Sequence, residues 1–123
     1  MKTHKSDDIA NLYKIFEETV AGNDVDRLLA EFYSPDVTFV GTGLPLSQGP
    51  VVKDILGGLC GAVKSVRVEQ LQTIIVEPSK VLIDFAIVHA KGADGTTTED
   101  RSTCVFYNGP NGWRCVADIF IRD

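Results

Sequence analysis

The order of the predicted elements indicates an α+β protein in which three helices precede a mostly antiparallel sheet. Residues 7–62 contain three segments with the apolar spacing of amphipathic helices. Residues 66–122 contain strand-like segments separated by turn signals. Helices that come first and strands that follow are typical of a segregated α+β fold. The chain has 123 residues, which suits one domain with its own core, so we expect a single domain over residues 1–123.

The ends of the three helices are marked by capping residues. We expect the first helix over residues 7–20, with Ser6 as its N-cap and Gly22 after its end. Asn23 or Asp24 can cap the second helix, and Pro35 ends it, because proline disfavours helix at the preceding residue. Pro50 fits the first position of the third helix.

The predicted strands cover residues 37–40, 66–76, 80–91, 97–107 and 113–122. The strand over residues 80–91 is apolar on both faces, which indicates that it is covered on both sides. Asp94 and Gly95 predict a hairpin turn after it. Residues 41–49 contain three glycines and are expected to form a loop that acts as a mobile flap at the mouth of a pocket.

Composition and charge exclude several classes of protein. The net charge is −5, and no cluster of lysine and arginine alternates with aromatic residues, so nucleic-acid binding is not expected. No apolar run is long enough to span a membrane, and the start has no signal-like apolar region, so we expect a cytoplasmic protein. The odd number of cysteines favours buried free thiols. Two histidines far apart do not form a metal site, and no cofactor is expected.

Two parts of the chain resemble the nuclear transport factor 2-like superfamily. Residues 28–56 read LLAEFYSPDVTFVGTGLPLSQGPVVKDIL, and residues 101–121 read as a hairpin around a glycine-rich turn. The superfamily includes ketosteroid isomerase, the SnoaL-like cyclases, limonene epoxide hydrolase and scytalone dehydratase. The resemblance implies a cone-shaped, cystatin-like α+β barrel, in which three helices pack in the concave face of a curved sheet and enclose a pocket. It does not imply one reaction, because the fold carries many chemistries.

The resemblance also identifies the positions at which known members carry their catalytic groups. The three positions used by the isomerases fall on Ile15, Gly41 and Thr103, none of which is a base at neutral pH. The pattern of limonene epoxide hydrolase retains Arg101 but has Thr103 in place of an aspartate. Its last-strand aspartate falls on Ile119, with Asp118 one residue away. Neither mechanism is therefore expected in this chain.

Asp84 is the candidate catalytic residue, because it lies within the apolar run VLIDFAIV. Strand alternation places it on one face with Val88, and the resemblance implies that this face lines the pocket. A hairpin loop of two or four residues would put Arg101 and Thr103 on the same face. Burial raises the pKa of a carboxyl group and suits it to acid or base chemistry, whereas a nearby arginine would keep it ionised. The structural alternative is a buried ion pair, or an aspartate that accepts a backbone N–H.

Two hypotheses follow for the function, and the first is a small-molecule-binding protein of SnoaL-like type. In this first hypothesis, Asp84 is the acid or base of a proton-transfer reaction such as isomerisation, cyclisation or dehydration. Arg101 and Thr103 bind the polar group of a small apolar ligand. The apolar walls of the pocket would come from Ile15, Phe39, Leu44, Ile55, Leu59 and Val88.

The second hypothesis is a non-catalytic binding or assembly module. Under both hypotheses we expect a homodimer through the outer face of the sheet, because apolar residues on a face away from the helices need covering. The residues expected on that face are Phe106, Val116, Phe120 and His89.

Overall fold

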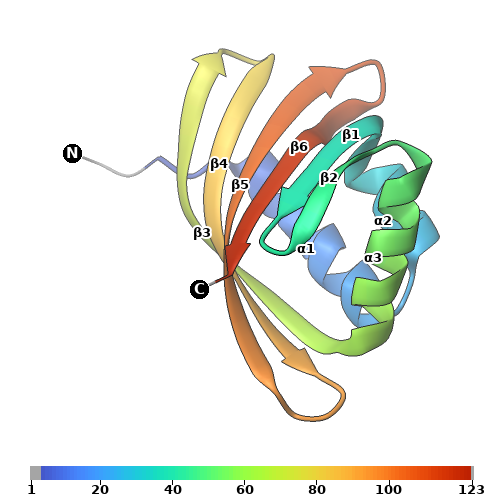
Figure 1. Ribbon diagram of the computed structural model, residues 1–123. Helices are drawn as coiled ribbons and strands as arrows, with labels where there is room; N and C mark the ends of the chain where they lie inside the picture. Colours follow the sequence, from blue (N-terminus) through green and yellow to red (C-terminus); the bar gives the residue numbers. More distant parts are fainter. Residues whose placement is uncertain (1–3, 123) are drawn as a thin grey trace.

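The computed structural model describes residues 4–122, and it has three helices packed against one face of a six-stranded sheet (Figure 1). The helices are α1 (Asp7–Ala21), α2 (Val25–Glu31) and α3 (Pro50–Ala62). The strands are β1 (Tyr33–Gly41), β2 (Leu44–Gln48), β3 (Val63–Glu77), β4 (Val81–Gly92), β5 (Thr97–Gly109) and β6 (Gly112–Arg122). The predicted α+β class is confirmed, and the sheet is curved.

The strand order is β2-β1-β6-β5-β4-β3, so β2 and β3 form the two edges and the sheet does not close. Neighbouring strands are antiparallel except for β1 and β6, which are parallel. The parallel pair arises because α3 and the strands β3 to β5 separate β1 from β6 in the chain. The sheet is therefore mostly antiparallel, as predicted.

The helix caps follow the sequence signals. The Ser6 side chain accepts a hydrogen bond from the backbone N–H of Ile9, and Gly22 is the C-cap of α1. Asp24, rather than Asn23, caps α2 through the backbone N–H of Arg27. Pro50 occupies the first turn of α3, as expected. These caps satisfy backbone groups that a helix leaves without partners.

Several predicted boundaries are wrong, among them the start of the first strand, which is Tyr33 rather than residue 37. Helix α2 ends at Glu31, well before Pro35, because Tyr33 already belongs to β1 and the backbone carbonyl of Phe32 accepts the N–H of Cys115. Residues 44–48 are not a loop but the edge strand β2, which pairs with β1. Gly41 pairs with Leu44, so the connection between these strands is a two-residue turn.

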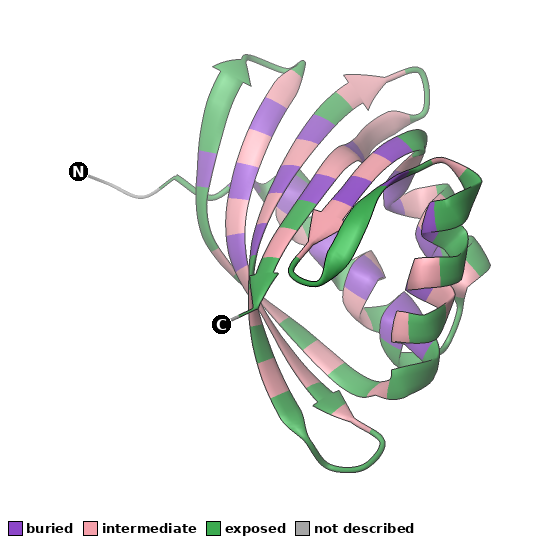
Figure 2. Ribbon diagram, viewed as in Figure 1, coloured by how far each residue is buried: buried purple, intermediate pink, exposed green. Residues whose placement is uncertain are grey.

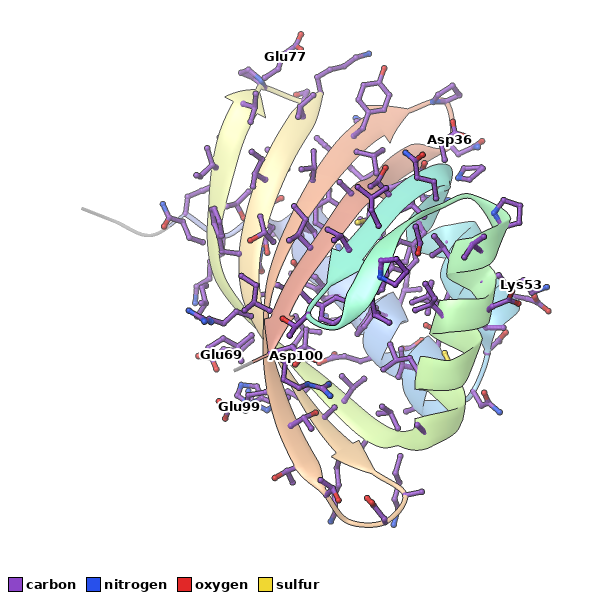
Figure 3. All side chains as sticks on the ribbon, viewed as in Figure 1. Asp36, Lys53, Glu69, Glu77, Glu99 and Asp100 are labelled. Atoms are coloured by element: carbon purple, nitrogen blue, oxygen red, sulfur yellow. The ribbon has the colours of Figure 1, made fainter. Side chains whose placement is uncertain are left out.

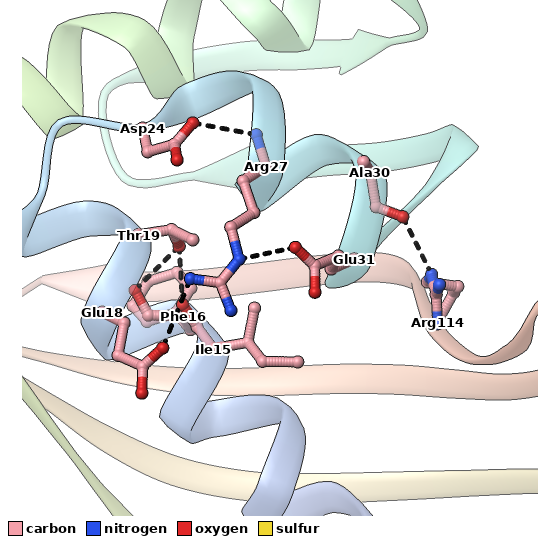
Figure 4. Close-up of polar contacts among 9 residues, drawn as sticks. All are labelled: Ile15, Phe16, Glu18, Thr19, Asp24, Arg27, Ala30, Glu31 and Arg114. Atoms are coloured by element: carbon pink, nitrogen blue, oxygen red, sulfur yellow. Dashed lines mark hydrogen bonds and ion pairs between the residues drawn. The ribbon is translucent and has the colours of Figure 1, made fainter.

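The corner between α1 and α2 is held by one arginine. Arg27 donates to Glu31 on its own helix and to Glu18 on α1 (Figure 4). Both ion pairs are exposed, so each contributes at most about 1 kcal/mol to stability. Arg114 of β6 donates to the backbone carbonyl of Ala30, which ties the end of α2 to the sheet.

The hairpin between β4 and β5 has a loop of three residues, and this loop decides which side chains share a face. Gly92 and Thr96 are joined by a backbone hydrogen bond, so residues 93–95 form the loop, and Gly95 adopts a φ of 88°. Asp84 therefore lies opposite Cys104, and Ile87 lies opposite Arg101. The prediction that Arg101 and Thr103 share a face with Asp84 is wrong, because it assumed a loop with an even number of residues.

The face of the sheet toward the helices carries side chains in rows that run across neighbouring strands. The most buried polar row contains Thr73, Asp84, Cys104 and Asp118. The next positions along the strands are Ser102 and Phe120, and then Asp100 and Arg122. Burial decreases along these rows toward the exposed β4–β5 hairpin (Figure 2).

An aromatic cluster joins the helices to the sheet. The ring of Phe32 lies 4.7 Å from Tyr33, 5.3 Å from Phe16 and 5.7 Å from Phe106, measured between ring centroids. All four side chains belong to the buried core. Phe106 therefore faces the helices, and the prediction that it lies on the outer face is wrong.

Gly41 and Phe120 are opposite each other on β1 and β6, and the phenyl ring lies over the glycine. A Cβ atom at residue 41 would lie 2.1 Å from Cζ of Phe120. The ring also packs against Phe39, at a centroid distance of 5.2 Å. Phe120 thus faces the helices, again contrary to the prediction, and it uses space that a side chain at residue 41 would need.

We expect Gly41→Ala to lower the free energy of unfolding by about 1–3 kcal/mol, the usual cost of overpacking. Urea unfolding monitored by circular dichroism would measure the change. Phe120→Leu should recover part of the loss in the Gly41→Ala background, because it removes the ring that the new methyl group meets.

Gly57→Ala is the matched control, since a Cβ at this position of α3 meets no atom within 4 Å. It should be neutral or stabilising, because alanine is the better helix former. Equal effects of Gly41→Ala and Gly57→Ala would contradict the packing of Phe120 over Gly41.

Candidate functional site

A cavity of about 760 Å³ lies between the helices and the inner face of the sheet. Its walls are mostly apolar, and its volume is within the range of small-molecule sites. Five residues expected in the pocket wall line this cavity: Phe39, Leu44, Ile55, Leu59 and Val88. The predicted site residues Ile15, Asp84, Arg101 and Thr103 are not among the lining residues.

Asp84 is fully buried, with a relative exposure of 0%. Its carboxylate accepts hydrogen bonds from Tyr13 Oη at 2.7 Å, from Gln70 Nε2 at 2.9 Å and from the Thr73 hydroxyl. Tyr13 does line the cavity, so Asp84 reaches the cavity only through this tyrosine. These donors satisfy the carboxylate, as burial of a polar group requires. A catalytic role for Asp84 stays a prediction, and its contacts also fit a structural link between α1 and the sheet.

Arg101 and Thr103 alternate onto the outer face of β5, opposite Ile87 and Phe85 of β4. Ile15 packs against the core from α1 without lining the cavity. The polar groups that the sequence analysis expected together, Asp84 with Arg101, therefore lie on opposite sides of the sheet.

Asp118 of β6 is the buried carboxyl group at the inner end of the cavity wall. It is buried, and its Oδ2 accepts a hydrogen bond from Tyr33 Oη at 2.7 Å. Tyr33 also lines the cavity and lies at the start of β1. Asp118 is opposite Cys104 of β5, whose neighbour along the same face is Ser102.

Burial dominates the acid–base properties of this pair. Desolvation raises the pKa of the Asp118 carboxyl, and hydrogen bonds from Tyr33, Cys104 and Ser102 only partly oppose it. Desolvation and the nearby Asp118 carboxyl raise the pKa of the Tyr33 hydroxyl well above its ordinary value. Asp118 is thus biased toward the protonated acid, and Tyr33 stays a hydrogen-bond donor.

Cys104 and Cys115 lie beside Asp118, and one ligand atom of each residue lies within 4.8 Å of the others. This spacing alone is compatible with a metal ion. However, the hydrogen bond to Cys115 and burial raise the pKa of the Cys104 thiol, and burial raises that of Cys115. In the protein without a bound ion, we interpret the three groups as a hydrogen-bonded cluster. All three cysteines are free and buried, as predicted.

A second polar group lines the cavity farther along β6. Arg122 forms two hydrogen bonds with Asp100 of β5, Nε to Oδ1 at 2.7 Å and Nη2 to Oδ2 at 2.9 Å. Figure 3 shows Asp100 near the C-terminal end of β6, where the long strands converge in this view. The arginine that lines the cavity is therefore Arg122, not Arg101.

Sequence reasoning missed Asp118, Tyr33 and Arg122. The strand register was the missing information, because a shift of one residue exchanges the two faces. A bulge between β5 and β6 adds to the difficulty: Val105 pairs with Ala117 and Phe106 with Cys115, which leaves Val116 unpaired. The sequence does contain one signal for Asp118, an aspartate within an apolar run. Asp118 lies within CVADIFI, just as Asp84 lies within VLIDFAIV.

Among residues 4–122, no helix is long and apolar enough to cross a membrane. No protein-family model matches the chain, and no curated protein matches its sequence.

Solved structures match nearly the whole chain at low sequence identity. A protein of the nuclear transport factor 2-like family from Streptomyces avermitilis, provisionally described as a dehydratase, has a TM-score of 0.76 at 14% identity and covers 94% of each chain. A ketosteroid isomerase-like protein from Erwinia carotovora atroseptica has a TM-score of 0.71 at 15% identity and covers 93% of this chain and 92% of its own. A protein from Novosphingobium aromaticivorans, provisionally described as an aromatic ring hydroxylase, has a TM-score of 0.72 at 16% identity. The match covers 93% of this chain and 85% of that protein.

The raised pKa of Asp118 predicts a specific dependence of stability on pH. Its folded-state pKa lies above the ordinary value of 3.8, so the folded state binds its proton more tightly than the unfolded state. The resulting stability is present below about pH 3.8 and is lost as pH rises through the folded-state pKa. Asp118→Asn lacks this titration, so its free energy of unfolding should rise relative to the wild type between acid and neutral pH.

Urea unfolding of both proteins at several pH values would measure the difference. Asp36→Asn, at an exposed position of β1, is the control and should keep the pH profile of the wild type. A constant difference between Asp118→Asn and the wild type at every pH would contradict a raised pKa.

Proposed function

On the nuclear transport factor 2-like fold that this chain adopts, we propose that the protein binds a small apolar molecule in its cavity and catalyses a proton transfer on it. The observation that supports the proposal most directly is the buried Asp118–Tyr33 pair on the cavity wall. Similar structures are described as dehydratase, hydroxylase or isomerase-like proteins, which is compatible with an enzyme but does not identify a reaction.

Asp118 would exchange the proton and Tyr33 would hold the carboxyl group in position. Tyr33 occupies Oδ2, so exchange with a ligand would use Oδ1. The protonated acid can donate a hydrogen bond to a carbonyl oxygen of the ligand, and the carboxylate can accept a proton from a neighbouring carbon. Burial raises the pKa of the Asp118 carboxyl, and a pKa perturbed by burial is common among the groups that transfer protons in active sites.

The apolar walls would supply affinity and exclude water. Ile55 and Leu59 approach from α3, Val88 from β4 and Phe39 from β1. Burial of a ligand against such side chains contributes about 25 cal/mol for each Å² of apolar surface. Exclusion of water also strengthens each hydrogen bond that the inner polar groups make.

Hydrogen–deuterium exchange tests the proposal without knowledge of the natural substrate. β-Tetralone is an apolar ketone with exchangeable protons next to its carbonyl group, and its exchange in D₂O can be followed by NMR. We expect the wild type to accelerate exchange over buffer and Asp118→Asn to lose about 100-fold or more of that acceleration.

Asp84→Asn tests whether Asp84 rather than Asp118 exchanges the proton, because Asp84 does not line the cavity. It should retain most of the exchange activity, and Asp36→Asn should retain all of it. Loss of activity in folded Asp84→Asn with activity kept in Asp118→Asn would return the catalytic role to Asp84. An absence of both binding and exchange in the wild type would contradict the proposal.

A second candidate function is a dimeric binding or assembly module. The outer face of the sheet supports it, because Ile119 and Ile121 of β6 are 41% and 49% exposed there and Ile74 of β3 is exposed on the same face. Tyr107 of β5 is also exposed. Exposed apolar groups gathered on one face favour an interaction surface, and a two-fold dimer would cover it.

We expect Ile119→Lys to shift the protein from dimer to monomer in sedimentation velocity at micromolar concentration. Val51→Lys is the matched control, since Val51 is 55% exposed but lies on α3, on the other side of the sheet, and it should leave the dimer intact. A monomeric wild type at this concentration would contradict an interface on the outer face.

A further inference from the structure

The cavity has polar groups in two separate places, and the apolar side chain of Phe120 lies between them on β6. The inner polar site consists of Asp118 and Tyr33 with Ser102 and Cys104. The outer polar site is the ion pair of Asp100 and Arg122. Phe120 lies between Asp118 and Arg122 on the same face of β6. Val68 of β3 and Val88 of β4 lie in the same row as the ion pair and give the outer site apolar neighbours.

Strand geometry fixes the distance between the two sites. Asp118 and Arg122 are four residues apart on β6, and their partners Cys104 and Asp100 are four residues apart on β5. At about 3.3 Å per residue, the sites are separated by about 13 Å along the strands. A ligand that touches both sites must therefore be elongated.

The outer site is rigid and close to electrically neutral. Two hydrogen bonds fix the guanidinium of Arg122 against the Asp100 carboxylate, whose side chain is mostly buried. The backbone N–H of Arg122 also donates to the Thr42 hydroxyl in the turn between β1 and β2. Arg122 uses only two of the five guanidinium N–H groups in this pair, so others can donate to a ligand oxygen.

Charge disfavours an anion at this place. Asp100 already compensates Arg122, and Asp54 of α3 adds a further carboxylate to the cavity wall. A ligand carboxylate would have to compete with Asp100 for the guanidinium and approach Asp54. At the inner site, a buried carboxyl group among apolar side chains offers no compensation for a charged ligand group.

We propose that the cavity selects an uncharged, elongated, apolar molecule with a hydrogen-bonding oxygen at each end, and that the Asp100–Arg122 pair binds the end away from Asp118. This inference rests on the proposed function, because it concerns the ligand of the same cavity. It assigns Arg122 and Asp100 to ligand selection, a role separate from the proton transfer at Asp118.

Competition binding with linear probes tests the inference. The fluorophore Nile red would report occupancy of the cavity, and three competitors would displace it: decanol, decane-α,ω-diol and ω-hydroxydecanoate. The diol carries the second oxygen that the outer site should bind. We expect it to bind the wild type about tenfold more tightly than decanol does, the ratio expected from one hydrogen bond to a charged group. The ω-hydroxy acid should bind more weakly than the diol.

The double variant Asp100→Leu/Arg122→Met removes the ion pair without leaving an unpaired charge. It should bind decanol as well as the wild type does but lose the preference for the diol. The matched control is Asp26→Leu/Lys53→Met, which removes an exposed ion pair between α2 and α3. Lys53 lies on the outside of α3, away from the sheet (Figure 3). Neither control residue lines the cavity, so the preference for the diol should remain.

The outcomes separate this inference from the proposed function. If decanol and the diol bind the wild type equally, the outer site does not select the ligand and only the inference is overturned. Tighter binding of the ω-hydroxy acid than of the diol would overturn the inference that the ligand is uncharged. If no competitor displaces Nile red, or Nile red does not bind, the cavity does not bind apolar molecules and the proposed function fails as well.

Discussion

The pairing of Asp84 with Cys104 across β4 and β5 is the constraint on which the rest of the structure depends. Side chains alternate along a strand, so this register decides for every residue of β4 and β5 whether it meets the helices or the outer face. The pairing of β5 with β6, with its bulge at Val116, extends the arrangement to β6. The two pairings together turn Asp118 and Arg122 toward the cavity and Arg101 and Ile119 away from it. The register is set by a three-residue loop, in which Gly95 adopts a positive φ.

The buried polar row is tolerated because each of its members finds a partner. Thr73 and Tyr13 donate to Asp84, and Tyr33 donates to Asp118. Within residues 4–122, no buried side-chain nitrogen or oxygen atom lacks a hydrogen-bond partner. The two aspartates lie on the same row but in different surroundings. Asp84 is enclosed by donors from α1 and β3, whereas Asp118 keeps one side toward the cavity.

The sequence predicted the elements better than it predicted their pairing. Local signals such as Ser6, Gly22 and Pro50 mark helix ends because capping is a local interaction. The apolar wall residues Phe39 and Val88 were also predictable, since periodicity and the family resemblance agree on their positions. The polar site was not, because a one-residue difference in a loop or a bulge at Val116 exchanges the faces of a strand. Hydrogen-bond partners distant in the chain, such as Tyr33 and Asp118, leave no local signal.

Phe120 over Gly41 also bears on how this cavity can change in evolution. The family resemblance aligns Gly41 with the aspartate base of the isomerases, and here the phenyl ring of Phe120 lies where a side chain at that residue would be. A single substitution at residue 41 would introduce the carboxylate and a steric clash together. The acid could be acquired only after residue 120 had become smaller, and that first change alone would remove packing against Phe39 without a catalytic gain. We therefore expect the two positions to form an epistatic pair, in which selection for activity would favour neither change by itself.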